Sequence, residues 1–361
     1  MRLLAIAGGL LIVLVILWDA FEAVVLPRRV TRRLRLIRLV GLVIWRLWTA
    51  LARRLPAGNR RETYLSYYGP LLLILILVTW AGGLVVGFAL VQWGLGSRLS
   101  APEGTVSFAT DLYMSGTTFF TLGLGDVAPL SWPARVVTVV EAGTGFGFLA
   151  LVIGYLPVFY QAFSRRETQI SMLDAWAGSP PTAAGLMWRL GRDESVPAIA
   201  GFLQEWEHWS AELLESHLSY PILAFFRSQH GNQSWLAGLT MVLDTCALVL
   251  VGVDGAPKRA AWLTFANARH VVVDLCQVFD APPRAPPSDR LSATDLVRLR
   301  AMLREVGVSV ADGPAADARL AELRRQYEPY VNALANRLLM PLPPWLPEAG
   351  ARDNWERSAW H

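Results

Sequence analysis

One short segment carries most of the chemistry that this sequence can be expected to perform. It reads Thr121-Leu-Gly-Leu-Gly-Asp126, and its two glycines alternate with residues that carry side chains. Glycine adopts backbone conformations that other residues avoid, so successive carbonyl oxygens in such a segment can all point to one side. Rings of carbonyl oxygens can replace the hydration shell of a dehydrated monovalent cation. We therefore expect a cation site made of backbone oxygens.

The elements that position this segment are expected to lie in a membrane. The chain of 361 residues is 53% hydrophobic and only 17% charged, a balance typical of a membrane protein with a soluble part. A helix needs roughly 20 apolar residues to cross the hydrocarbon core. Three stretches meet this requirement: Leu3 to Leu26, Tyr64 to Trp93 and Val136 to Phe163. The net charge of +4 is too small to indicate a nucleic-acid partner.

The segment from Asp111 to Pro129 lies between the second and third stretches and is too short and too rich in glycine to cross. Irregular backbone is tolerated at membrane depth only where it is buried in protein or lines a water-filled path. The pattern predicts a re-entrant segment, with a short helix over residues 108–119 that leads into an extended strand.

Basic residues predict the orientation of these spans. Arginines crowd the segment Arg28 to Arg38, whereas the connection between the second and third stretches holds only Arg98 and Arg135. Because positive charge favours the cytoplasmic side, the N-terminus is expected outside and everything after Arg165 inside. We expect the segment Arg28 to Arg38 to bind anionic lipids and Leu39 to Leu55 to lie along the inner face. The first stretch has no small-residue cleavage site after it, which favours a retained anchor over a signal peptide.

The segment and its context resemble the pore of potassium channels. Thr121-Leu-Gly-Leu-Gly-Asp126 is similar to the signature loop Thr-Val-Gly-Tyr-Gly-Asp, and it stands between two apolar spans as that loop does. The resemblance covers about Tyr64 to Arg165 and implies a potassium-type cation channel of a prokaryotic plasma (inner) membrane. It implies that Asp126 braces the filter from behind. It also implies that K+ is coordinated by the Thr121 hydroxyl and by filter carbonyls, in a filter formed by Thr121, Leu122, Gly123, Leu124 and Gly125.

The sequence departs from the pattern of that family in three places. Leu124 stands where tyrosine or phenylalanine is usual, a change also seen in the second pore loop of animal two-pore-domain channels. Phe120 stands where a second threonine is common, and Tyr113 and Met114 replace paired tryptophans that clasp the filter. A looser clasp weakens discrimination against sodium. Selective potassium conduction is the prediction, and weakly selective cation conduction is the alternative.

One pore loop in each chain requires several chains to assemble. A ring of carbonyls needs about four contributors, so a homotetramer with cyclic symmetry is expected. The only cofactors expected are K+ ions in the filter, with no organic group.

Further candidates lie around the filter. An acid in lipid is costly and therefore a functional candidate, and Glu141 is expected to face the pore helix and to hydrogen-bond near Thr117 or Thr118. These three residues would then support the filter. A ring of acids that lines a cavity is the alternative for Glu141. The third span also contains closely spaced glycines that predict close helix packing or a gating bend, namely Gly143, Gly145 and Gly147.

The remaining chain predicts an all-α cytoplasmic domain. Helices are expected over Pro197 to Leu218, Ser234 to Val251, Ala260 to Phe279, Ala293 to Val306 and Asp317 to Leu339. The stretch Trp235 to Val253 could form a fourth crossing, but Asp244 at its centre favours a buried core helix. Cys246 and Cys276 are expected to be reduced core residues. One helical face gathers polar residues more typical of a solvated surface than of a metal site, namely Glu205, His208, Glu212 and Glu215.

The predicted fold class is therefore an all-α integral membrane protein with a tetrameric potassium-channel pore module and a helical cytoplasmic domain. The expected parts are an N-terminal span (1–27), a basic interfacial segment (28–62), the pore module (63–165), the cytoplasmic domain (166–340) and a Pro-rich tail (341–361). Within the pore module we expect an outer helix (64–93), a pore helix (108–119), the filter (121–126) and an inner helix (132–163).

Two other classes of function are open. The chain could be a membrane sensor that uses the pore module only for assembly, or a membrane-anchored hydrolase. We find no nucleophile motif and no paired acids in a credible setting, so the prediction is that the chain is not an enzyme. The glycine fingerprint of a nucleotide-binding regulatory fold is also missing, and the gating stimulus acting through the cytoplasmic domain is left open.

Overall fold

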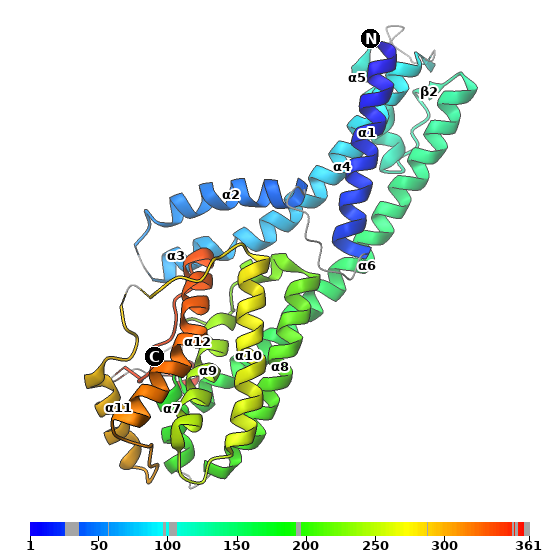
Figure 1. Ribbon diagram of the computed structural model, residues 1–361. Helices are drawn as coiled ribbons and strands as arrows, with labels where there is room; N and C mark the ends of the chain where they lie inside the picture. The colour runs from blue at the N-terminus through cyan, green and yellow to red at the C-terminus, as the bar shows by residue number, and fades with distance from the viewer. Residues whose placement is uncertain are drawn as a thin grey trace. The chain divides into compact units, whose positions relative to one another are not determined.

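The computed structural model describes residues 1–25, 36–56, 58–96, 99–100, 107–192, 196–286, 288–348, 350 and 353–356. Most of this part of the chain is helical, and its two short strands, β1 (Leu99–Ser100) and β2 (Ala128–Pro129), pair antiparallel with Leu99 opposite Pro129. The chain divides into two compact units (Figure 1). Unit 1 comprises Met1–Leu51 with Tyr67–Gln161, and unit 2 comprises Ala52–Ser66 with Ala162–His361.

Unit 1 is organised around the packing of α1 (Arg2–Ala20) against α4 (Tyr68–Leu95) (Figure 1). Glycines let the two helices approach closely. A Cβ added to Gly9 would lie 2.5 Å from the carbonyl oxygen of Gly87, and one added to Gly83 would lie 2.2 Å from Cδ1 of Ile16. Small residues at such contacts are the usual means by which helices associate in lipid. The N-terminal helix α1 is therefore closely fitted to α4.

The acidic residues near the end of α1 are buried and paired with tryptophans. Trp80 Nε1 donates to Asp19 Oδ2 at 3.0 Å, and Trp18 Nε1 donates to Glu22 Oε1 at 2.9 Å. Beyond Ala20 the chain continues as a short π-helix, η1 (Phe21–Val25). The arginines from position 28 to 35, on which the predicted lipid contact chiefly rests, lie outside the described residues.

The helix α2 (Leu36–Ala52) covers much of the stretch expected to lie along the inner face. It packs against the start of α4. Tyr68 donates a hydrogen bond from its hydroxyl to the Gly41 carbonyl oxygen at 2.9 Å, and its ring meets the buried Trp45 ring edge-on at 4.5 Å between centroids.

Unit 2 is a helical domain with α9 at its core. Its helices are α3 (Asn59–Ser66), the last part of α6 (Trp132–Ala177), α7 (Ala183–Arg192), η2 (Val196–Ala198), α8 (Ile199–Ser219), η3 (Pro221–Phe225), α9 (Trp235–Gly252), α10 (Lys258–Val278), α11 (Ala293–Arg304), α12 (Pro314–Leu338) and η4 (Asn354–Glu356). Helix α9 contacts α7, α8, α10 and α12. Two features were not expected: α7, and the inclusion of residues 52–66 in unit 2 rather than in a separate basic segment.

Four helices in the described part of the chain are long and apolar enough to cross a membrane by length and composition, namely Arg2–Val24, Asn59–Leu95, Trp132–Ala177 and Trp235–Gly252. The last differs from the others in its burial. In its 18-residue apolar stretch 83% of the residues are buried inside the chain, whereas the corresponding share is 11% for Trp132–Ala177. A helix already covered by its own domain has little surface left for lipid. We therefore interpret α9 as a core helix of unit 2.

A buried ionic network explains the acid in the middle of α9. Asp244 is 0% exposed and forms an ion pair with Arg290 through Oδ2 and Nη2, while the Tyr327 hydroxyl donates to Asp244 Oδ1 at 2.5 Å. Arg290 also donates to the Pro343 carbonyl oxygen at 3.0 Å. Buried charges persist when they are paired and hydrogen-bonded, so this network joins the C-terminal segment to the core of unit 2.

Candidate functional site

The helix α5 (Phe108–Phe119) carries the chain to the filter segment. Its buried face holds Met114, Ser115 and Phe119, and this face packs against α4. Ser115 Oγ donates to the Val85 carbonyl oxygen at 2.7 Å. The end of α5 is therefore held in place by the outer helix before the filter begins.

The backbone that follows α5 alternates in conformation. Thr121, Gly123 and Gly125 have positive φ angles of 58°, 59° and 75°, whereas Leu122 and Leu124 between them do not. A threonine in this region is strained, and such strain is characteristic of functional sites. When residues alternate between left-handed and right-handed backbone conformations, neighbouring N–H groups point to one side of the chain. The carbonyl groups then point to the other side.

The hydrogen bonds of the segment agree with this alternation. The amides of Leu122 and Gly123 both donate to the Thr117 carbonyl oxygen, at 2.8 and 3.4 Å, and the Thr121 amide donates to the Thr118 carbonyl oxygen at 3.0 Å. The amides thus point back to α5. In the described part of the chain, no hydrogen bond ends on a carbonyl oxygen of residues 121–125. These oxygens remain available to a ligand.

The filter segment is open to its surroundings in a single chain. All residues from Thr121 to Asp126 are exposed, and the Leu122 and Leu124 side chains reach 62% and 63% exposure. Apolar side chains of this size are expected to be covered in a folded membrane assembly. The described part of a single chain therefore leaves these two side chains uncovered.

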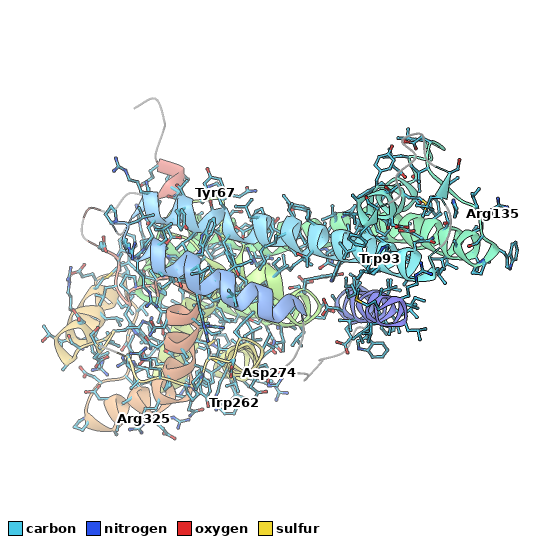
Figure 2. The ribbon with its side chains drawn as sticks, turned by 90° about the horizontal axis from the view of Figure 1, so that it is seen from above. Tyr67, Trp93, Arg135, Trp262, Asp274 and Arg325 are labelled. Atoms are coloured by element: carbon cyan, nitrogen blue, oxygen red, sulfur yellow. The ribbon has the colours of Figure 1, made fainter. Side chains whose placement is uncertain are left out.

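The outer end of the filter is tied to α5 by a tyrosine. The Tyr113 hydroxyl donates to Asp126 Oδ2 at 2.9 Å. Further along, Arg135 on the first turn of α6 (labelled in Figure 2) donates from Nε to the Pro129 carbonyl oxygen at 3.0 Å. This bond was not predicted, because Tyr113 was interpreted only as a replacement for a tryptophan; a phenol that precedes an acid in a re-entrant segment could have indicated it.

Glu141 is buried against α5, but its partner differs from the one expected. The side chain is 0% exposed and accepts a hydrogen bond from Ser115 Oγ rather than from Thr117 or Thr118. Helical spacing explains the correction, because Ser115 shares the buried face of α5 with Met114 and Phe119 whereas the two threonines do not. The full burial of Glu141 in one chain also contradicts the alternative of an acidic ring exposed to a cavity.

The three closely spaced glycines of α6, Gly143, Gly145 and Gly147, have different surroundings. A Cβ added to Gly145 would lie 1.9 Å from the carbonyl oxygen of Phe119, the last residue of α5, whereas one added to Gly143 or Gly147 would meet nothing within 4 Å. Gly145 is therefore the point at which α6 crosses the end of the pore helix. The other two glycines are not required by contacts within one chain.

Helix α6 is also held to α4 nearer its start. Gln92 Nε2, buried on α4, donates to the Ala134 carbonyl oxygen at 3.1 Å and to Thr138 Oγ1 at 3.0 Å. Together with Glu141 and Gly145, these positions form one face of α6 that is turned toward α4 and α5. The opposite face is left uncovered.

The remaining candidates stay on surfaces or in the core of unit 2. The polar residues of α8 that were considered as metal ligands are exposed, and in the part of the chain that the structure describes no group of three or more His, Cys, Asp or Glu side chains could hold a metal ion. Cys246 and Cys276 are free and buried. Burial raises the pKa of the Cys276 thiol to about 12.

Comparison with known proteins agrees with this geometry. Residues 73–162 match the family model described as ion channel, and this range includes most of α4, all of α5, the segment Thr121 to Asp126 and the first two thirds of α6. This part of the chain is therefore similar to ion channels, and the chain is an all-α membrane protein.

The chain is also similar to a protein of Bacillus subtilis (strain 168) whose name reads "Uncharacterized membrane protein YdjJ". The two are 25% identical over 208 residues, which is 57% of this chain and 60% of that protein. No solved structure matches the chain.

Proposed function

We propose that the chain is one subunit of a homotetrameric, potassium-selective channel. The observation that carries the proposal is the backbone of residues 121–125, with positive φ at every second residue. The amides of Thr121, Leu122 and Gly123 are engaged on the α5 side, and the carbonyl oxygens of the segment are unused by the described part of the chain. Four such segments around one axis would present rings of oxygens to a dehydrated cation. Thr121, Leu122, Gly123 and Leu124 are the proposed K+ ligands, with Gly125 completing the filter.

The supporting residues divide into two groups. Thr117 and Thr118 would support the filter through their backbone carbonyls, and Asp126 would brace the outer mouth through its bond with Tyr113. Glu141 would act from the other side of α5, where it engages Ser115. The proposed roles of Gly143 and Gly147 in a gating bend rest on their open surroundings, and Gly145 is assigned to packing instead.

The experiment is a flux and reversal-potential measurement on the purified protein in liposomes. We expect barium-sensitive K+ flux and a reversal potential that reports selection of potassium over sodium under bi-ionic conditions. Gly123→Ala is expected to abolish flux without preventing assembly, because alanine is strained at a φ of 59° although the site has room for its methyl group. Gly154→Ala on α6 is the matched control, since Gly154 has equal room, a helical backbone and no proposed role in the pore.

Each other outcome selects a different function. A bi-ionic reversal potential near zero would favour the weakly selective cation channel, in keeping with Phe120 and the single Tyr113 clasp. Assembly with no flux for any cation would favour a membrane sensor. A single copy in the membrane would refute the channel proposal altogether, because one segment cannot close a ring.

The proposed setting is the plasma (inner) membrane of a prokaryote, with the N-terminus outside and unit 2 in the cytoplasm, where it would transmit the gating signal. The basic segment Arg28 to Arg38 is proposed to contact anionic lipid. Labelling of an introduced cysteine in η4 with a membrane-impermeant reagent tests the orientation. Labelling from outside intact cells would contradict it.

A further inference from the structure

One buried serine of α5 is hydrogen-bonded on two sides. Ser115 Oγ lies 2.7 Å from the Val85 carbonyl oxygen of α4, and it also bonds Oε1 of Glu141 on α6. Ser115 and Glu141 are both 0% exposed. The serine therefore connects the two long helices between which α5 is held.

These two bonds cannot both take their proton from the serine. A hydroxyl group has one proton to donate and two lone pairs that accept. The Val85 carbonyl oxygen can only accept, so its bond uses the Ser115 proton. The simplest assignment, in which Ser115 also donates to Glu141, is short of one proton. The second bond is complete only if Glu141 supplies its proton.

The other oxygen of the acid leads to the same conclusion. Oε2 of Glu141 is buried and has no hydrogen-bond partner among the described residues. An ionised carboxylate shares its negative charge between both oxygens, so one charged oxygen would be buried without a donor. Burial of a charged group in this way is far more costly than burial of the carbonyl oxygen of a neutral acid.

No cation compensates a charge at this position. Helix α4 carries no Asp, Glu, Lys, Arg or His. On α5 the charged residue is Asp111, which is itself a buried acid one turn before Ser115. On α6 the nearest arginine, Arg135, is exposed and bonded elsewhere, and in the described part of the chain the bond with Ser115 is the polar contact of Glu141. Because a buried charge persists only when it is paired, these surroundings favour the neutral form.

We infer that Glu141 is a neutral carboxylic acid in the folded pore module and donates its proton to Ser115 Oγ, while Ser115 donates its own proton to the Val85 carbonyl oxygen. This pair of bonds joins α6 to α4 through α5, the helix that carries the filter. It makes Ser115 and the Val85 carbonyl positioning groups beside Glu141. The inference deepens the proposed function and rests on it for the effect on flux, whereas the position of the proton does not depend on conduction.

The first test is an infrared spectrum of the full chain in liposomes at neutral pH. A protonated carboxylic acid has a C=O stretching band that a carboxylate lacks. The spectrum of the parent minus that of Glu141→Gln is expected to show one such band, at the high-frequency end of its range because Oε2 accepts no hydrogen bond. Asp111→Asn removes another buried acid and is the matched control, which should retain the band. A difference spectrum with carboxylate bands instead would overturn the inference.

A serine variant tests the bond rather than the charge. Ser115→Ala removes the acceptor of the Glu141 proton, so the acid band is expected to move to higher frequency. Thr79→Val on α4 removes a hydroxyl that bonds only within its own helix and should leave the band in place. An unmoved band in Ser115→Ala would overturn the inference. If Glu141→Gln is poorly produced, the shift between the parent and Ser115→Ala is decisive, because only a protonated acid has the band.

A second readout compares two neutral substitutions of the acid. Glutamine has the shape of the protonated acid, and its amide can donate to Ser115 Oγ, whereas methionine has a similar size and no donor. Glu141→Met is expected to lower K+ flux at least about fivefold, the effect of one lost hydrogen bond on a barrier. Glu141→Gln is expected to recover most of that loss. Equal flux in the two variants would contradict the inference, because an ionised Glu141 would lose its charge in both.

The two readouts also separate this inference from the proposed function. A folded parent chain that shows the acid band but conducts no cation would refute the channel and keep the assignment of the proton. Barium-sensitive K+ flux without the acid band would refute the assignment and keep the channel.

Discussion

Substitution of Gly145 by alanine should disable the pore while leaving unit 2 folded. The added Cβ would lie 1.9 Å from the Phe119 carbonyl oxygen, which is 1.5 Å inside the 3.4 Å at which ordinary contact begins. The atom it meets belongs to the backbone and cannot rotate away. Overpacking of this kind costs about 1–3 kcal/mol or more, against a gain of about 1 kcal/mol from the better helix propensity of alanine.

The consequence for the filter follows from its position in the chain. Phe119 is two residues before Thr121, so a displacement of the Phe119 backbone by about 1.5 Å would also displace the filter. This exceeds the roughly 0.5 Å within which the groups of a functional site must be held. Because each 1.4 kcal/mol added to a barrier slows passage about tenfold, we expect K+ flux in liposomes to fall roughly tenfold or more.

Another glycine of α6 provides a matched control. Gly154→Ala adds the same methyl group to the same helix, but nothing lies within 4 Å of the new atom, and Gly154 has no proposed role in gating. This variant should retain flux within about threefold of the parent, given the modest helix-propensity effect. If Gly145→Ala conducts as well as Gly154→Ala, the assignment of Gly145 as the crossing point of α6 and α5 is refuted.

Three further predictions concern single contacts. Tyr113→Phe removes the hydrogen bond to Asp126, worth about 1 kcal/mol, and should lower the ratio of K+ to Na+ permeability by up to about fivefold. An unchanged ratio would show that this hydrogen bond does not contribute to selectivity. Asp244→Asn removes the buried carboxylate that pairs with Arg290 and leaves that guanidinium only Glu328, whose Oε1 lies 3.4 Å from Nη1; this should cost up to about 3 kcal/mol and lower the melting temperature, whereas Asp254→Asn at an exposed site should not. Burial lowers the pKa of His217 to about 3, so the folded chain keeps this imidazole neutral while the unfolded chain protonates it below about pH 6.5. The folding stability that depends on the neutral His217 should be lost as the pH falls from 6.5 toward 3, by about 3 kcal/mol at pH 4.5. On acidification the melting temperature should therefore fall less in His217→Asn than in the parent chain. The exposed control His208→Asn should behave like the parent.

The amino-acid sequence by itself determined the features that depend on local pattern. Apolar runs of sufficient length indicated the spans, and helical periodicity indicated α8 to α12, because burial of one helical face repeats every three or four residues. The cap of α11 is also a local feature, because Ser292 precedes the helix and its Oγ accepts from the Asp295 amide at 3.1 Å. The filter segment could also be identified from the sequence, because its alternating glycines determine its backbone conformation locally. Helix α7 was missed because its two glycines, Gly185 and Gly191, lower the helical signal, yet both lie at close contacts that only the folded domain reveals.

Only the tertiary structure decided which side chains meet. Glu141 pairs with Ser115, and Gly145 rather than its neighbours contacts the pore helix, because both outcomes depend on how α6 is rotated against α5. The acid in α9 could be assigned to a core only after Arg290 and Tyr327, distant in sequence, were found beside it. Spacing along one helix restricts each residue to a face, but the partner on the other side of that face is selected by packing between elements.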